Sequence, residues 1–461
     1  MATLQSGTAG AGGDGSNNET EASQSGGEGQ PSDPKQKAPL RTITVVFGGV
    51  ILDLLGFTTM LPLLPALLDY YQHNDSSGLY ASLLTSVTPF QHLIGVPSKF
   101  NSVLLGGLLG SLFWLVQFLS SPLTHALSDV YGRKPMFLVI LVGKAVSYGL
   151  WAAASTFSLF VVACIIGSAA KGSMSLGYSI VGDTTDTHAR ARGRAVVGVA
   201  YNIGFTLGPV VGAAFSRWGD LGWFPASALY ALALTVTNIT FFTAFFRETL
   251  PQNKRRPSLA AGVCEAWKFI NPRAVFSFSS LEGFSKEERN RLLQFVWFFF
   301  LFASLQSGLE FTLPFMTHHK HGYDSLAQGY MLSLLYLVKS LTPDRLLLFR
   351  LADSKKALAH VALVMMVPAF ILIGVGKTSV DLYFGLTLYA IGSSLMETCL
   401  QELSPLNLSL VDVQKISSLT LLGRACGTFV MAAGFWCLGA EVCYMVGGLS
   451  LLVPLIMLRC C

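Results

Sequence analysis

The stretch ILDLLGFTTMLPLLPALLDYY, residues 51 to 71, places one acid, Asp53, in a segment whose other residues suit the interior of a lipid bilayer. The apolar segment runs from about Thr42 to Leu67, which is long enough to cross a hydrocarbon core that requires about 20 residues. Asp53 falls close to its middle. A carboxylate at that depth is costly, and helix packing does not require it, so Asp53 is a candidate functional group.

The rest of the chain repeats this membrane pattern. Hydrophobic residues make up 52% of the sequence and charged residues only 12%, and the hydropathy separates into about twelve apolar segments rather than one soluble core. We therefore predict an all-α polytopic membrane protein. The spans are expected at 42–67, 101–124, 135–155, 157–182, 194–215, 223–246, 292–315, 325–342, 357–376, 382–405, 416–438 and 440–459.

Two polar stretches interrupt the apolar segments. Residues 1–40 are rich in Gly and Ser and contain no aromatic residue, so they cannot bury enough surface to order. Residues 251–291 carry eight Lys or Arg against four Glu and include a short amphipathic stretch at about Ala261 to Ile270. The expected domains are a disordered cytosolic tail (1–40), an N-terminal six-helix bundle (41–250), a basic cytosolic linker (251–291) and a C-terminal six-helix bundle (292–461).

The distribution of cations predicts the orientation. If the N-terminus is cytosolic, the loops and termini on that side hold 23 of the 31 Lys and Arg, and the opposite side holds four. The positive-inside rule then favours cytosolic N- and C-termini. The net charge of +5 is therefore a topology signal and no argument for nucleic-acid binding. The first inter-helix loop, about 68–100, faces the other side and contains Asn74-Asp75-Ser76, a glycosylation acceptor.

Four basic residues, Lys144, Lys171, Lys339 and Arg424, and two further principal acids, Glu310 and Glu397, lie deep inside the predicted spans. Gly167, Lys171, Ser175 and Tyr178 recur at three or four residues and predict one polar helix face, so we assign Lys171 and Tyr178 to a substrate cavity. Lys144 is open between a structural and a functional partner, and is retained as a cavity candidate. Glu310 is a second cavity candidate, with a structural ion pair as its alternative.

The remaining intramembrane charges receive structural interpretations. We expect Glu397 and Arg424 to pair with each other. Lys339 lies near a helix end and is expected to extend to the membrane interface. His318, His319 and His321 fall in a predicted loop, where solvated side chains are favoured over a zinc site.

Two motifs carry further information. LTHALSDVYGRKPMFLV, residues 123–139, places Asp129, Gly132, Arg133 and Lys134 in a tight turn between two helices. GFTLGPVVGAAF, residues 204–215, places Gly204, Gly208 and Gly212 on one helix face, which permits close approach of a neighbour, while Pro209 removes a backbone donor.

The first motif resembles the loop between helices two and three of the major facilitator superfamily, and the second resembles the fifth-helix signature of its drug:proton antiporter branch. LDLLGFTTMLPLLPALL is similar to the first helix of bacterial tetracycline antiporters. The resemblance covers about 41–335 and weakens from about Lys339 to Ala433. It implies two pseudo-symmetric six-helix bundles that rock around a central cavity, with the Asp129 to Lys134 loop gating the conformational change.

The same resemblance implies proton coupling at Asp53, a kink at Pro62 and Pro65, and Glu310 as the counterpart of the first helix in the second half. The chain departs from the family at several positions: His125 replaces a usual Gly, Val130 a frequent Arg, and Ala213 a final Gly. Cys164 stands where the fourth helix usually has an Arg associated with proton coupling.

The sequence contains no phosphate-binding loop, nucleophile elbow or paired His on a helix face, so we predict no enzyme, no cofactor and no metal. If Glu397 neutralises Arg424 and Lys339 reaches the interface, Lys144 and Lys171 face Asp53 and Glu310. A protonated Asp53 then leaves a positive cavity, which favours an anionic ligand.

We therefore predict a secondary active transporter, an organic anion antiporter with proton coupling through Asp53. Its expected partners are a small organic solute, a proton or counter-anion and the lipid bilayer of the plasma membrane or an organelle, and a monomer is expected. The alternatives are an uncoupled facilitator, a multidrug or cation exporter, and a non-transporting scaffold.

Overall fold

The computed structural model describes residues 34–184, 187–217, 223–256, 258–271, 286–342, 355–403 and 410–460, and every regular element among them is helical. The predicted disordered tail, 1–40, is described only from Pro34, where α1 begins, so residues 34–40 are helical and that part of the prediction is wrong. The rest of the tail and the middle of the linker lie outside the described residues.

The first half contains α1 (Pro34–Thr58), η1 (Leu61–Leu63), α2 (Leu64–Asn74), α3 (Leu79–Ile94), α4 (Asn101–Tyr131), α5 (Arg133–Ala152), α6 (Phe157–Ala169), α7 (Ser173–Thr184), α8 (Thr187–Phe215) and α9 (Trp223–Phe245). The linker forms α10 (Leu259–Ile270), which confirms the predicted amphipathic helix. The second half contains α12 (Lys286–His321), α13 (Ser325–Leu341), α15 (Lys355–Val375), α16 (Ser379–Leu403), α17 (Leu410–Ser450) and α18 (Leu452–Cys460).

These helices confirm the all-α membrane fold. Among the described residues, nine helices are long and apolar enough to cross a membrane. One of them, Lys415–Leu458, covers the last two predicted spans, because the chain turns at Gly439 inside α17 with a φ of 79° that favours glycine. Helices α13 and α16 lie over the eighth and tenth predicted spans but are not among these nine.

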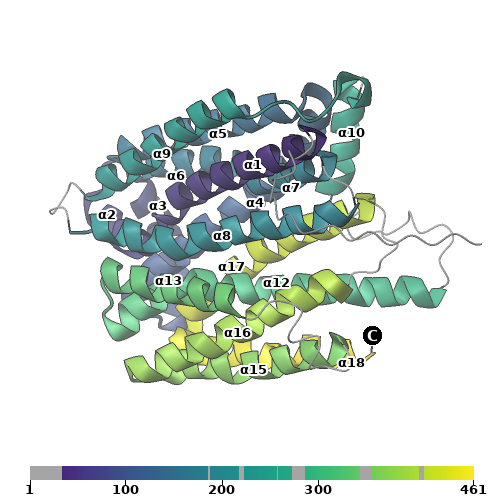
Figure 1. Ribbon diagram of the computed structural model, residues 1–461. Coiled ribbons are helices and arrows are strands. Elements are labelled where there is room, and N and C mark those ends of the chain that lie inside the picture. The colour runs from purple at the N-terminus through teal and green to yellow at the C-terminus, as the bar shows by residue number, and fades with distance from the viewer. Residues whose placement is uncertain are drawn as a thin grey trace, which may run out of the picture.

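The helices of the two halves lie in adjacent groups (Figure 1), with the purple-to-teal helices α1 to α9 on one side and the green-to-yellow helices α12 to α18 on the other. The groups meet where α8 packs against α13 and α4 packs against α17. Because consecutive helices run in opposite directions, one end of the molecule carries Asn74 and the other carries Asp129. We call these the Asn74 end and the Asp129 end.

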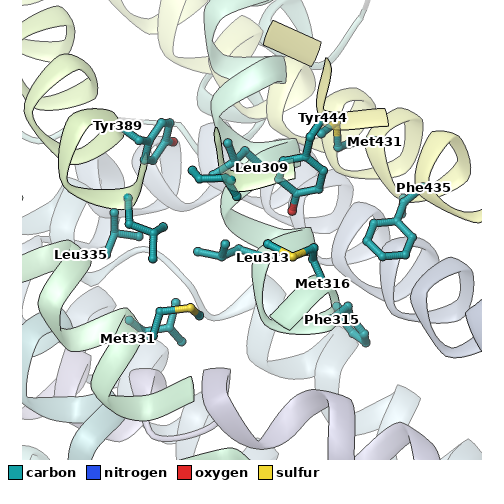
Figure 2. Close-up of a cluster of buried hydrophobic side chains, with 14 of the residues drawn as sticks. Leu309, Leu313, Phe315, Met316, Met331, Leu335, Tyr389, Met431, Phe435 and Tyr444 are labelled. Atoms are coloured by element: carbon teal, nitrogen blue, oxygen red, sulfur yellow. The ribbon is translucent and has the colours of Figure 1, made fainter. Parts of the chain in front are cut away.

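Large apolar side chains fill the second group and its boundary with the first. Figure 2 shows Leu309, Leu313 and Met316 of α12 beside Met331 and Leu335 of α13, with residues of α16 and α17 around them. Leu309, Leu313 and Met316 have no exposed surface. Such packing fixes the helix positions, because cavities and strained rotamers in a dense interior are both costly.

Three local expectations require correction. The first helical segment continues through α2 to Asn74, beyond the predicted end at Leu67, after a break at η1 that contains Pro62. The predicted first loop contains α3, which begins and ends at glycines with positive φ. The fourth span is interrupted between Ala169 and Ser173, because α6 ends and α7 begins there.

Candidate functional site

Asp53 lies inside the first group of helices and is fully compensated. Its side chain accepts a charge-assisted bond from Lys144 of α5 and a 2.5 Å hydrogen bond from Ser173 Oγ. Lys144 also donates to Ser173 Oγ at 2.9 Å. Asp53 and Lys144 are each only 3% exposed. A buried charge pair of this kind is tolerated because each ion neutralises the other and satisfies its hydrogen bonds.

Asp53 also faces the start of a helix. Ser173 is the first residue of α7, where unpaired backbone N–H groups give the terminus partial positive charge. The carboxylate of Asp53 therefore has a cationic partner on α5 and a hydroxyl donor at the start of α7. The sequence left open whether Lys144 is a structural or a functional partner. In the structure it forms the ion pair with Asp53. Whether it also contacts substrate stays a prediction.

Lys171 occupies the break between α6 and α7. Its ammonium lies 2.7 Å from the ring centroid of Phe57 and 5.5 Å from that of Phe113. The expected polar helix face is therefore wrong as a continuous face, because the helix stops on both sides of Lys171. Tyr178 is carried by α7 and packs, half-buried, against the apolar cluster around α1 and α5.

Arg424 of α17 does not pair with Glu397 as expected. Its guanidinium lies 4.9 Å from the Trp114 ring centroid, and Trp114 packs edge-on against Phe113 at 5.5 Å. Lys171 and Arg424 thus flank one pair of adjacent aromatic residues of α4. Within the part of the chain that the structure describes, neither cation forms an ion pair with a carboxylate.

Lys339 does not extend to the interface. Its ammonium lies 2.5 Å from Glu310 Oε1 and 3.8 Å from Glu397 Oε1, and its side chain is 9% exposed. Gln306 donates to Glu397 and, at 3.4 Å, to Glu310, while Tyr389 Oη lies 3.1 Å from Glu310. Two carboxylates and the rings of Tyr336 and Tyr389 surround the Lys339 ammonium, so its charge is compensated inside the second half of the molecule.

The intramembrane charges therefore form two groups with different surroundings. Asp53 and Lys144 are buried and balanced. The side chains of Glu310 and Glu397 keep 22% and 45% exposure, so the second group is more open than the first. Lys144, Lys171, Lys339 and Arg424 against Asp53, Glu310 and Glu397 leave one positive charge when all are ionised.

The Asp129 to Lys134 loop is held by contacts with other helices. Arg133 binds Asp129 and Asp183, each at 2.8 Å, so it connects the turn to α7. Gly132 has a φ of 107°, and a Cβ there would lie 2.6 Å from Glu248 Oε2, so glycine is required. Glu248 accepts the backbone N–H groups of Arg133 at 2.9 Å and Lys134 at 3.0 Å and thereby caps α5.

The small-residue face of α8 contacts α1 just beyond Asp53. A Cβ on Gly204 would meet Leu54, one on Gly208 would meet Thr58, and one on Gly212 would meet Thr59. Thr58 Oγ1 donates to the Gly204 carbonyl at 3.0 Å. On another face of α8, the Pro209 carbonyl lies against Gly329 of α13. The helix that carries Asp53 is thus packed directly on a helix of the boundary between the groups.

At the Asn74 end, hydrogen bonds join the two groups of helices. His318 Nε2 lies 3.0 Å from Asp69 Oδ2, and His319 Nε2 lies 3.2 Å from Ser102 Oγ. Trp436 Nε1 donates to Asn101 at 2.9 Å. All three histidines, His321 included, are therefore part of α12, which corrects their assignment to a loop, and His318 and His319 also contact the first group.

Asn74 itself is exposed at the last residue of α2, where its side chain donates to the Tyr70 carbonyl at 3.0 Å. The side chain is accessible, but its modification stays a prediction.

Several residues of this arrangement were not identified from the sequence. Gln306, Trp114 and Glu248 carry no signal of their own, because each acts through a residue distant along the chain.

Comparisons with known proteins agree with this arrangement. The model of the Major Facilitator Superfamily matches residues 46–440. The chain is 38% identical to human major facilitator superfamily domain-containing protein 10 over 449 residues, which covers 94% of this chain and 96% of that protein. It is 26% identical to the class C tetracycline resistance protein of Escherichia coli over 216 residues, 47% of each chain. The crystal structure of the human organic anion transporter MFSD10 (TETRAN) superposes with a TM-score of 0.74 at 36% identity and covers 93% of this chain and 100% of that one.

Proposed function

Because the chain belongs to the Major Facilitator Superfamily, and is therefore a membrane transporter and not an enzyme, we propose that it carries small organic anions by secondary active transport coupled to protons. Lys171 and Arg424 support the choice of anions most directly. They approach the same aromatic pair from different halves of the chain, and among the described residues they have no carboxylate partner. A solved relative that covers 93% of this chain is itself described as an organic anion transporter.

The chemistry of these two cations favours an aromatic or amphipathic carboxylate. An ammonium and a guanidinium donate charge-assisted hydrogen bonds to a carboxylate, and Arg presents two parallel donors. Phe57, Phe113 and Trp114 offer apolar surface beside them for the body of the ligand. The single excess positive charge of the site also matches a monoanion.

Asp53 is the proposed coupling group. A proton on Asp53 would leave Lys144 without its counter-ion, and Lys144 is close enough to Lys171 for their charges to interact. Protonation would therefore add positive charge beside the proposed anion contact. The fifth-helix signature implies exchange, so the counter-substrate would be a second anion when no proton gradient is present.

Alternating access would occur by rocking of two bundles, residues 41–250 and 292–461, joined by the basic linker 251–291. The Asn74-end contacts of His318 and His319 would open as the Asp129 end closes, and the loop held by Arg133 and Glu248 would control that closure. The positive-inside distribution supports a cytosolic Asp129 end with both termini in the cytosol.

The test is uptake of p-aminohippurate into proteoliposomes that contain the purified protein, with tetraethylammonium as the cationic comparison. We expect saturable p-aminohippurate uptake that a pH gradient stimulates. Lys171→Gln and Arg424→Gln should each raise the apparent KM about tenfold or more, since a hydrogen bond to a charged group contributes about 1.5–3 kcal/mol. Lys171→Arg should retain part of the affinity.

Lys320→Gln is the matched control, because Lys320 binds Glu441 at 3.1 Å, away from Lys171 and Arg424. Uptake of tetraethylammonium in preference to p-aminohippurate would favour a cation exporter. Uptake that ignores the pH gradient would favour an uncoupled facilitator, a possibility that the full compensation of Asp53 by Lys144 also supports. If the purified protein is correctly folded but takes up neither solute, a non-transporting scaffold would be favoured.

A further inference from the structure

Glu397 has a different environment from the other intramembrane acids. Asp53 has its own lysine and a serine hydroxyl. Glu310 has Lys339 at 2.5 Å and the Tyr389 hydroxyl at 3.1 Å. Glu397 shares Lys339 at 3.8 Å, beyond hydrogen-bond distance, and its direct donor is the neutral amide of Gln306. It is therefore the least compensated of the three carboxylates.

The two carboxylates lie close together, because one amide group, that of Gln306, contacts both. A single lysine can neutralise only one of them. The other titratable and charged groups that face this pair come from α8, α13, α16 and α17. They are Tyr201, Tyr336, Lys339, Tyr389 and Arg424.

Arg424 is the second cation of this environment. Its charge interacts with Glu310 and Lys339, although it forms no ion pair with either acid among the described residues. While Arg424 is unoccupied, two cations therefore face two carboxylates. An anion on Arg424 would cancel one of those positive charges and leave Lys339 alone with Glu310 and Glu397.

We propose that Glu397 is a second proton-accepting group, and that it takes up a proton when an organic anion binds at Arg424. The proton enters from solvent, to which the side chain of Glu397 is 45% exposed, and it neutralises the carboxylate that Lys339 contacts less closely, at 3.8 Å. Closure of the site would strengthen this effect, because removal of water disfavours an uncompensated charge. This inference rests on the proposed transport of organic anions.

If this is so, a proton on Glu397 and an organic anion at Arg424 favour each other's binding and do not compete. Coupling between two binding sites is reciprocal, so a proton on Glu397 must raise the affinity for the anion by the same factor by which the anion raises the affinity for the proton. A typical coupling is about 5- to 150-fold. We therefore expect apparent anion affinity to rise several-fold as the pH falls.

The experiment measures the apparent affinity for a naphthalenesulfonate as a function of pH, by inhibition of p-aminohippurate exchange in proteoliposomes without a pH gradient. A sulfonate remains anionic across the range, so any pH dependence belongs to the protein. Glu397→Gln carries a neutral side chain of similar shape. It should bind the sulfonate at all pH values with the affinity that the wild type reaches only at low pH.

Glu397→Asp tests the same group with the acid retained, and should keep the pH dependence. Glu441→Gln is the matched control, since Glu441 is an acid of the same half that binds Lys320 instead. The proposal is overturned if the sulfonate affinity of Glu397→Gln still depends on pH as in the wild type. It is also overturned if, at high pH, that variant binds the sulfonate more weakly than the wild type does. Loss of the pH dependence only in Asp53→Asn also overturns it but leaves the proposed function intact, whereas failure of the wild type to exchange p-aminohippurate refutes the proposed function itself.

Discussion

Replacement of Asp53 by Asn tests whether the buried pair with Lys144 has the energetic weight that its geometry suggests. The substitution keeps the shape of the side chain and the possibility of a hydrogen bond with Ser173, but it removes the negative charge. Lys144, at 3% exposure, would then have no counter-ion at 4 Å or less among the described residues. Removal of one partner of a buried ion pair costs about 3–5 kcal/mol.

This cost is a large share of the stability of a folded domain, which is about 5–15 kcal/mol. Near the midpoint, 1 kcal/mol shifts Tm by about 2–4 °C for a domain of about 150–250 residues, so a six-helix unit should lose roughly 6–20 °C. The assay is thermal unfolding of the purified protein in detergent, followed by tryptophan fluorescence at one fixed scan rate, for wild type, Asp53→Asn, Lys144→Gln and the double variant.

The double variant tests whether the loss of the ion pair causes the lower Tm. If the pair is the source of the cost, the double variant should recover much of the Tm lost in Asp53→Asn, because Lys144 is no longer a buried charge without a partner. Additive losses, or a shift below about 2 °C in Asp53→Asn, would refute the assignment of a tightly coupled pair. Proton-dependent uptake in Asp53→Asn at wild-type level would refute the separate proposal that Asp53 is the coupling group.

Three further predictions follow from local geometry. Gly208→Ala should destabilise the protein by about 1–3 kcal/mol, measured as a lower Tm, because its Cβ would occupy the place of the Thr58 hydroxyl, and Gly208→Ala combined with Thr58→Ala should recover part of the loss. Asp69→Asn should weaken the contact with His318 and increase labelling of cysteines introduced along the transport path from the Asn74 end; unchanged labelling would contradict a closing role for this contact. Endoglycosidase should shift the electrophoretic mobility of the wild type but not of Asn74→Gln, whereas a glycan in the N-terminal tail would overturn the predicted orientation.

The local pattern of the chain was sufficient to predict the class of fold. Long apolar runs specify membrane helices through the transfer of side chains into lipid, which is a property of each segment alone. The Asp129 loop and the glycine face of α8 were also predictable, because turn chemistry and close helix packing leave short motifs. The same reasoning selected Asp53, Lys171 and Glu310 as candidate functional residues, because a charge inside an apolar segment is visible in the sequence whatever the orientation of its side chain.

Only the tertiary structure decided how these charges combine. The sequence suggested that Glu397 pairs with Arg424 and that Lys339 extends to the interface. In the structure, Lys339 forms ion pairs with Glu310 and Glu397, and the Arg424 guanidinium packs on the Trp114 ring. The sequence also suggested one continuous polar face through Lys171, yet the helix breaks there. The sequence counts the charges in the membrane, but the energy of each charge depends on the few ångströms to its neighbours, and those distances exist only after helices from distant parts of the chain have packed.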